Sequence, residues 1–248
     1  MDSLPRLGDF LLGYTGVMMS NAALAQLKLL QLADSALPIG STAHSYGVES
    51  LVSEGQLGVA GLGQFLRAFV HESGQLEAYL AYQAWQLGAA TEFVQPWLNL
   101  NDQAAAFKPA RESRHASAVL GRRLLSLALQ LEPLPCWQQA STLAQAQQIE
   151  THHSCVFGLV AAGLAIEAEA MLAALLQQMT LSLILACQKI LPLGQVQAQQ
   201  LLWQLHPSIQ AVVAQTPSTS FADLAPCSIG LDGASMRHPL LGTRLFIS

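Results

Sequence analysis

The sequence predicts an all-α protein, a single-domain bundle of about eight to ten helices with an irregular C-terminal tail. Apolar residues recur at helical spacing along most of the chain, as at Leu62, Phe65, Leu66, Phe69 and Val70. No stretch alternates apolar and polar residues with enrichment in β-branched side chains, so no strand is predicted. Prolines and glycines stand at the ends of the apolar runs, where helices are expected to stop.

The helical runs follow one another in a definite order. Helices are expected over residues 21–33, through 62–80 with an interruption at Gly74, and over 111–131, 136–148, 154–164, 167–191, 195–205 and 208–214. Prolines such as Pro109, Pro192 and Pro207 separate these runs. Asp102 precedes a run of alanines and is expected to cap a short helix.

Three parts of the chain differ in composition. Residues 1–20 have an apolar centre and an acidic flank, which favours a variable extension over a signal peptide with its basic flank. Residues 21–216 are expected to form the helical domain. Residues 217–248 contain too many prolines and glycines for regular helices, yet end in arginines and an apolar group, Leu245-Phe246-Ile247. Such a tail is expected to become ordered when a partner binds.

Composition points to buried contacts with other chains. The 248 residues are 52% hydrophobic and only 11% charged, against about 25% charged in typical soluble domains. Glutamine, with 25 copies, supplies much of the polar surface. A surface so poor in charge is expected to be covered in part by other subunits, including a second copy in a homodimer. The net charge of −5 and the scattered basic residues argue against nucleic-acid binding.

Two further features bear on the cellular compartment. The four cysteines lie far apart with no C-x-x-C pair, which favours free thiols in a reducing cytosol. Residues 170–188 carry no charge, but Gln177, Gln178, Thr180 and Ser182 are costly in hydrocarbon. This run is therefore expected to be a buried central helix, with no membrane partner and a cytoplasmic location.

Hydrolytic catalysis is not expected near His44, although Ser41 and Ser45 flank it. The nucleophile elbow G-x-S-x-G is absent, and no strand precedes the serines. Ser41 is expected instead to cap the helix that carries Glu49. His71-Glu72 lacks the second histidine of H-E-x-x-H, and no phosphate-binding glycine loop occurs, so no cofactor is expected.

The best candidate metal ligands are His152, His153 and Cys155, because imidazole and thiolate suit nickel or zinc. Adjacent ligands on a helix point about 100° apart, and no second pair follows at ligand spacing. The alternative is that these residues only begin a helix, with Cys155 packed as a small apolar side chain.

Three segments resemble the UreF family of urease accessory proteins. The first is Leu37-Pro38-Ile39-Gly40-Ser41-Thr42-Ala43-His44-Ser45-Tyr46-Gly47-Val48-Glu49, similar to the family's L-P-x-G-x-x-x-H-S-x-G-L-E-like segment. The second, Lys189-Ile190-Leu191-Pro192-Leu193-Gly194-Gln195, is similar to K-L-x-P-L-G-Q. The third, Ser235-Met236-Arg237-His238-Pro239-Leu240-Leu241-Gly242-Thr243-Arg244-Leu245-Phe246, is similar to S-M-R-H-E-x-x-x-S-R-L-F. Pro239, Thr243 and Thr42 depart from the family pattern.

The resemblance implies a non-catalytic helical dimer. Proteins of this family bind UreD, also called UreH, recruit the GTPase UreG, and help to deliver nickel into apo-urease. The residues expected to face partners are Gly40, Ser41, His44, Ser45, Glu49, Lys189, Met236, Arg237, His238, Arg244 and Phe246. Arginine suits this role because its guanidinium holds carboxylates with two hydrogen bonds.

Two alternatives remain open at this stage. One is an all-α metal-dependent enzyme that uses His44, His71 or the His152-His153 pair. The other is a direct nickel carrier, which the seven histidines favour and their dispersion along the chain disfavours. Both predict that the isolated chain binds metal in stoichiometric amount.

Overall fold

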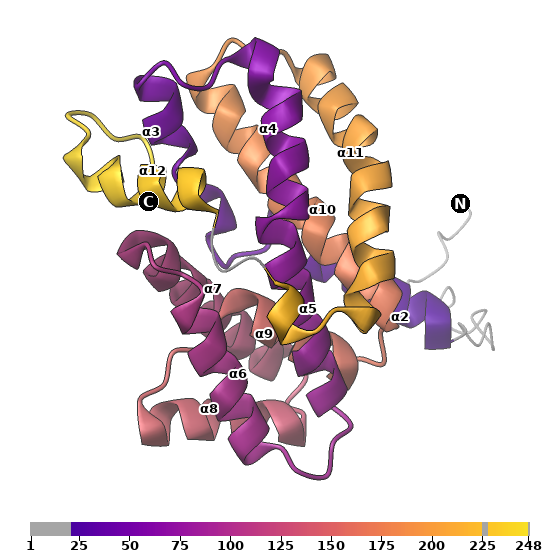
Figure 1. Ribbon diagram of the computed structural model, residues 1–248. Helices are drawn as coiled ribbons and strands as arrows, with labels where there is room; N and C mark the ends of the chain where they lie inside the picture. The colour runs from indigo at the N-terminus through magenta and orange to yellow at the C-terminus, as the bar shows by residue number, and fades with distance from the viewer. Residues whose placement is uncertain (1–20, 225–227, 248) are drawn as a thin grey trace, which may run out of the picture.

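The computed structural model describes residues 21–224 and 228–247, which form helices and turns with no strand (Figure 1). The predictions for residues 1–20 lie outside the described residues. The longer helices are α2 (Asn21–Leu32), α4 (Val59–His71), α5 (Ser73–Leu87), α6 (Val94–Ala106), α7 (Arg111–Leu131), α8 (Pro135–Gln147), α9 (His153–Gly163), α10 (Ala168–Ile190) and α11 (Gln195–Gln215). The short elements are η1 (Ser41–Ala43), α3 (Val48–Ser53), η2 (Thr216–Ser218), η3 (Phe221–Asp223), α12 (Ile229–Arg237) and η4 (His238–Leu240). The predicted all-α class is confirmed.

The core forms where α5 packs against α9 and α10. Residues His153–Ala161 of α9 are all buried, because α5 covers one side of this helix and α7 another. The backbones approach closely at Gly158, where a Cβ atom would lie 2.0 Å from the carbonyl oxygen of Ala81. A glycine is required at this crossing because any side chain would push the two helices apart.

Helix α10 is buried in the bundle, as its sequence predicts. Within the described chain it is the one helix long and apolar enough to cross a membrane, and 61% of its apolar window is buried inside the fold. Its polar side chains bond internally: Thr180 Oγ1 donates to the Leu176 carbonyl at 2.7 Å, and Gln178 Nε2 donates to the Leu32 carbonyl at 3.2 Å. These features are those of the core helix of a bundle.

Several predicted boundaries agree closely with the structure. The helix expected over 111–131 has those limits, and those expected over 21–33, 136–148, 154–164 and 167–191 agree to within one residue. The expected interruption near Gly74 falls at Glu72, between α4 and α5. Gly74 itself packs against α10, since a Cβ atom there would lie 3.2 Å from Cδ2 of Leu176.

Three local predictions are wrong. Pro207 does not separate two helices, because α11 runs unbroken from Gln195 to Gln215. Pro207 has no N–H group, so the carbonyl of Trp203 lacks its helical donor. Both residues lie on the exposed side of the helix, where water can donate to this carbonyl instead. Asp102 lies inside α6 and caps nothing. The tail forms α12 despite Gly230 and Gly233, because this helix packs against α3 and α7.

Candidate functional site

Two segments from opposite ends of the chain lie against each other. The first runs through η1 into α3, and the second comprises α12, η4 and the residues up to Ile247 (Figure 1). The Ile247 amide donates to the Ala43 carbonyl at 3.0 Å. The tail is therefore docked on its own chain, and its end is held without an external partner.

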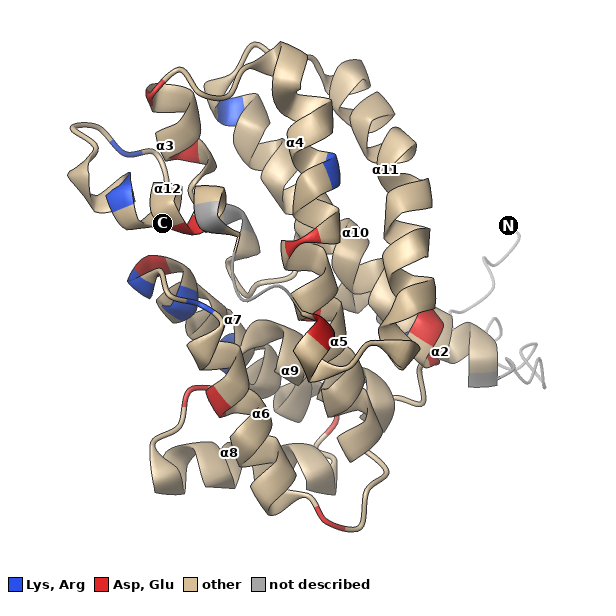
Figure 2. Ribbon diagram, in the orientation of Figure 1, with Lys and Arg blue, Asp and Glu red and all other residues tan. Residues whose placement is uncertain are grey.

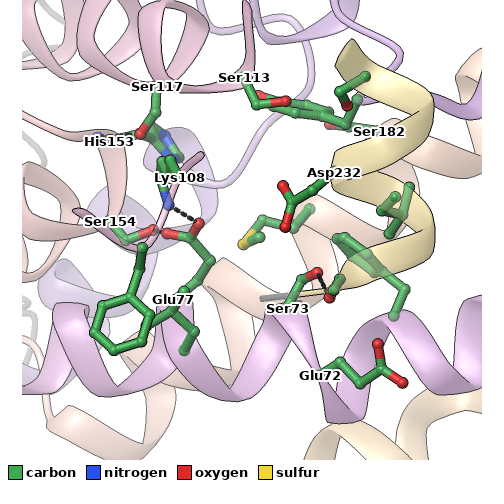
Figure 3. A pocket seen from close by; sticks show the side chains of 18 of the residues that line it. Glu72, Ser73, Glu77, Lys108, Ser113, Ser117, His153, Ser154, Ser182 and Asp232 are labelled. Atoms are coloured by element: carbon green, nitrogen blue, oxygen red, sulfur yellow. Dashed lines mark hydrogen bonds and ion pairs between the residues drawn. The ribbon is translucent and has the colours of Figure 1, made fainter. Parts of the chain in front are cut away.

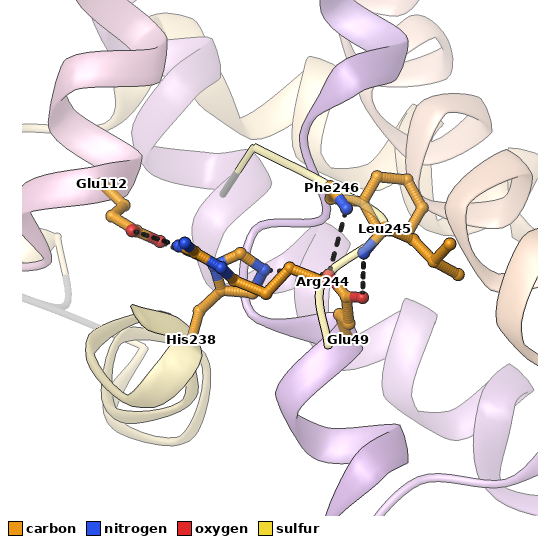
Figure 4. Close-up of polar contacts among 6 residues, drawn as sticks. All are labelled: Glu49, Glu112, His238, Arg244, Leu245 and Phe246. Carbon is orange, nitrogen blue, oxygen red and sulfur yellow. Dashed lines mark hydrogen bonds and ion pairs between the residues drawn. The ribbon is translucent and has the colours of Figure 1, made fainter. Parts of the chain in front are cut away.

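Glu49 is the anchor of this docking (Figure 4). The side chain is buried, and its Oε1 accepts the Leu245 amide at 2.7 Å. Oε2 accepts the Phe246 amide at 3.3 Å and lies 2.9 Å from Nε2 of His238. One carboxylate thus satisfies two backbone donors and one side chain of the tail, as a buried charge requires.

His238 is fully buried between two carboxylates. Its Nε2 contacts Glu49, and its Nδ1 lies 2.8 Å from Oε2 of Glu112, in the first turn of α7. Carboxylates only accept hydrogen bonds, so a histidine with hydrogen on both ring nitrogens satisfies the whole arrangement. Arg244 Nη1 lies 4.0 Å from the other oxygen of Glu112. The Glu49–His238–Glu112 unit, called here the glutamate clamp, joins α3, α7 and the tail.

Two glycines of the first segment allow the close approach. Gly47 has φ +88°, and a Cβ atom there would lie 2.8 Å from both the Leu231 carbonyl oxygen and the Ser235 amide of α12. Gly40 has φ +86°, and its Cβ would lie 2.6 Å from Nη1 of Arg123. A residue with a side chain is disfavoured at both positions by the positive φ, and at Gly47 also by the backbone atoms of α12.

The docked tail presents apolar side chains to solvent. Phe246 is buried, with Nζ of Lys189 5.1 Å from its ring centroid. Large apolar side chains on either side of it are exposed: Met236, Leu240, Leu245 and Ile247. Arginine residues of α7 and the tail lie on the same side of the molecule (Figure 2). We call this surface the tail face.

A surface groove runs beside the tail face, between the tail and the start of α7. Its volume is about 620 Å³, and it is lined by His44, Pro109, Arg111, Glu112, His115, Ala116, Ser235, Met236, Pro239 and Ile247. Arg237 does not enter the groove, because its Nε and Nη2 bond Glu54 at 2.7 Å each. This bidentate pair ties α12 to the end of α3 at the surface.

The structure brings most of the predicted site residues together, but it exposes some of them and buries others. Lys189, Met236 and Arg244 lie at the surface of the docked tail, whereas His44, Ser45, Glu49, His238 and Phe246 are buried around or beneath it. The predicted cap at Ser41 is wrong: Gly40 precedes η1, Ser41 makes no capping bond, and the helix of Glu49 begins at Val48.

Sequence reasoning missed the residues that complete the docking. Glu112 and Glu54 lie in distant segments, and nothing in their local sequence marks them as partners of His238 and Arg237. Gly47 could have been found, because it follows Tyr46 in the first of the segments that resemble the family, and a glycine in such a loop readily adopts a positive φ.

A cavity of about 120 Å³ lies beneath α12, between α5, α7 and α10 (Figure 3). Glu77 and Lys108 form a buried ion pair at its wall, and Ser154 Oγ donates to Glu77 at 2.5 Å. Burial opposes ionisation of Glu77, but the Lys108 ammonium and the Ser154 hydroxyl outweigh it and lower the pKa of this carboxyl. Nε2 of His153 is buried at this wall with no partner among the described residues.

The candidate metal ligands do not converge. His152 Nδ1 contacts Ser117 Oγ at 3.3 Å, whereas His153 lines the cavity. Burial lowers the pKa of both histidines to about 4 and raises the pKa of the Cys155 thiol, so the thiolate is disfavoured. No group of three or more His, Cys, Asp or Glu side chains that could hold a metal ion occurs in the described part of the chain.

Comparison with known proteins identifies the family. The sequence profile of UreF matches residues 58–206. The urease accessory protein UreF of Nostoc sp. is 34% identical over 224 residues, which cover 90% of this chain and 95% of that protein. The chain belongs to the UreF family. Two further UreF proteins are 34% identical in Thermosynechococcus vestitus, over 93% of this chain, and 32% identical in Paenarthrobacter aurescens, over 92% of it; both are covered in full.

The UreF profile stops short of both docked segments, since neither the first segment nor the tail lies within residues 58–206. The full-length relatives nevertheless align over nine-tenths of this chain. The relatives are named as accessory proteins of urease rather than as enzymes.

Proposed function

We propose that this UreF-family chain is a non-catalytic scaffold that binds UreD (UreH) and recruits the GTPase UreG, so that nickel is inserted into apo-urease. Family membership supports the urease-related role. The observation that carries the scaffold role is the tail face, where the docked tail exposes four large apolar side chains and buries Phe246. Exposed apolar groups rimmed by charged residues are typical of protein–protein contact surfaces.

The buried and exposed residues have different parts in this proposal. Glu49 and His238 position the tail from within, and they touch no partner. Leu240, Leu245 and Arg244 are exposed and form the contact surface. Arg244 is the better candidate for a partner carboxylate than Arg237, because Arg237 is already bonded to Glu54.

The test is complex formation by the full chain with its cognate UreD, and with UreG and GTP, measured by size-exclusion chromatography with light scattering. Leu240→Asp and Leu245→Asp each place a carboxylate on the tail face, and we expect at least a thirtyfold loss of UreD affinity, typical of contact residues. Val94→Asp is the matched control, because Val94 is exposed in the first turn of α6, where an acidic residue is tolerated.

Wild-type affinity in both tail variants would overturn the assignment of the tail face. A chain that forms no complex with UreD or UreG under any of these conditions would overturn the scaffold role itself. Elemental analysis of the purified chain tests the alternative of a nickel carrier, which predicts about one bound metal per chain, whereas the scaffold predicts none.

A further inference from the structure

The cavity beneath α12 is lined by polar groups whose hydrogen bonds are incomplete (Figure 3). Three side chains at its wall are each less than a tenth exposed, and each has a polar atom without a hydrogen-bond partner among the described residues. These atoms are Nε2 of His153, Oε1 of Gln178 and Oγ of Ser41. A buried polar atom without a partner is strongly disfavoured, so the cavity is expected to hold a molecule that bonds to this wall.

The atoms left without partners are able to accept hydrogen bonds. The Gln178 amide is oriented by its Nε2, which donates to the Leu32 carbonyl at 3.2 Å, so its Oε1 is left as an acceptor. Burial lowers the pKa of His153 to about 4, so the ring is neutral and its Nε2 can accept. The Ser41 hydroxyl both donates and accepts. A molecule that satisfies this wall therefore needs several hydrogen-bond donors.

The cavity also has more carboxylates than cations at its wall. Lys108 is the one lysine or arginine among the described residues that line it, whereas Glu72, Glu77 and Asp232 supply three carboxylates. Lys108 forms its ion pair with Glu77, and Asp232 has no ion-pair partner in the described part of the chain. Burial raises the pKa of Asp232, although the Lys108 ammonium acts in the opposite direction. A further cation in the cavity would balance these charges.

The size and the remaining wall of the cavity restrict the kind of cation. Its volume of about 120 Å³ is that of about four water molecules, or of about four non-hydrogen atoms. Phe69, Leu76 and Met179 give one part of the wall an apolar surface. The carboxylates are not arranged around one metal ion, since no group of three or more ligating side chains occurs among the described residues. A cation with N–H donors and a short apolar body fits all of these features.

We propose that the cavity beneath α12 is a binding site for a short-chain aliphatic amine in its protonated form. The ammonium group donates to the Asp232 carboxylate and to the acceptors without partners, and the alkyl part contacts the apolar wall. Asp232 belongs to α12, whereas Gln178 and His153 belong to α10 and α9. A ligand that bonds to both sides favours the state in which α12 and the tail are docked.

The test uses the full chain alone and compares three small molecules of similar size at equal ionic strength: n-propylammonium chloride, 1-propanol and sodium propionate. A dissociation constant of about 1 mM lies within the limit for a ligand of about four non-hydrogen atoms. We therefore expect about 10 mM n-propylammonium to raise the midpoint of thermal unfolding by about 3 °C. The neutral and anionic analogues are expected to raise it by less than about 1 °C, because neither brings a cation to the carboxylates.

Two variants change the charge and the space of the cavity separately. Asp232→Asn keeps the shape of the side chain and removes its charge, and we expect it to weaken n-propylammonium binding by about tenfold or more. Asp102→Asn is the matched control, because it removes the same charge at an exposed position of α6. Ser182→Val fills part of the cavity from α10, and we expect it to abolish the shift of the unfolding midpoint.

Equal shifts with the three molecules, or an Asp232→Asn variant that binds n-propylammonium as the wild type does, would overturn the proposal. So would the absence of any shift at about 50 mM amine, well above the expected dissociation constant, because the cavity would then hold water alone. An equal shift with Nα-acetyl-lysine amide would assign the site to a lysine side chain of a partner instead of a free amine. These measurements need neither UreD nor UreG, so their failure is distinct from failure of the scaffold role.

Discussion

Glu49 shows how one buried carboxylate can hold a whole segment. Its two oxygens receive the Leu245 and Phe246 amides and face the His238 ring. If the tail left, these donors would lose their acceptor, and Glu49 would lose its donors. A buried charge without partners is strongly disfavoured, so the clamp favours the fully docked state over partly docked ones.

Glu49→Gln is therefore expected to release the tail. The amide keeps one acceptor oxygen but directs hydrogens toward groups that are themselves donors. Breaking such a buried pair costs about 3–5 kcal/mol. We expect amide hydrogen exchange at Leu245 and Phe246 to accelerate at least a hundredfold, with little change in exchange of the α5 and α9 amides.

Glu54→Gln is the control for this experiment. Glu54 pairs with Arg237 at the exposed surface, where an ion pair contributes about 0–1 kcal/mol. We expect tail exchange to change less than about fivefold in this variant. Equal release of the tail by both substitutions would contradict the special role of the buried clamp.

Acid stability is expected to depend on His152 and His153, two of the buried histidines. Burial lowers the pKa of His152 and of His153 from 6.5 to about 4. In the unfolded chain both take up protons near pH 6.5, so the unfolded state binds more protons between pH 6.5 and 4. Stability is therefore expected to fall as the pH drops through this window, by on the order of 3 kcal/mol for each histidine.

Urea unfolding at a series of pH values measures this effect. The slope of the unfolding free energy against pH gives the number of protons taken up on unfolding. His153→Gln removes one titrating group, and we expect this number to decrease by about one between pH 6 and 4.5. Glu77 does not confuse the result, because its lowered pKa confines its contribution to more acidic conditions. An unchanged slope in the variant would show that other groups titrate in this window.

At the scale of the elements, α9 and α5 make one of the closest backbone contacts in the core. A Cβ atom at Gly158 would lie 2.0 Å from the Ala81 carbonyl oxygen, which is backbone and has no room to rotate away. We expect Gly158→Ala to lower the free energy of unfolding by about 3 kcal/mol or more, measured by urea denaturation. Gly61→Ala, where a Cβ meets open space, is expected to be neutral or slightly stabilising.

Helix positions could be predicted where apolar spacing and breakers agree, as for α7 and α10. They could not be predicted where tertiary packing overrides a local signal. Pro207 stays inside α11 because the buried face keeps its register on both sides of it. α12 forms across two glycines because docking supplies stability that helix propensity does not.

The candidate site was predictable as a set of residues but not as an arrangement. The first segment and the tail could both be singled out in the sequence, and the structure joins them. Their shared partner Glu112 lies in α7, and no local pattern relates it to His238. Which distant segments meet is decided by the fold. The hydrogen bonds and the burial of His238 and Glu49 therefore could not be derived from residue spacing in the sequence.

At the scale of the whole molecule, two surfaces of different composition lie on opposite sides. The tail face mixes apolar side chains with arginines, which suits a different protein that carries carboxylates. The surface of α11 carries no charged residue, so a partner that carries carboxylates is expected at the tail face rather than at α11.

This arrangement predicts that substitutions on α11 and on the tail face have separate effects on UreD binding. Leu240→Asp is expected to remove UreD binding, whereas Trp203→Ala is expected to leave it unchanged, because α11 lies on the opposite side of the molecule from α12. Light scattering of each variant with and without UreD distinguishes the masses of the free chain and the complex. If Trp203→Ala abolished UreD binding while Leu240→Asp left it intact, UreD would bind at α11, and the tail face would need another partner.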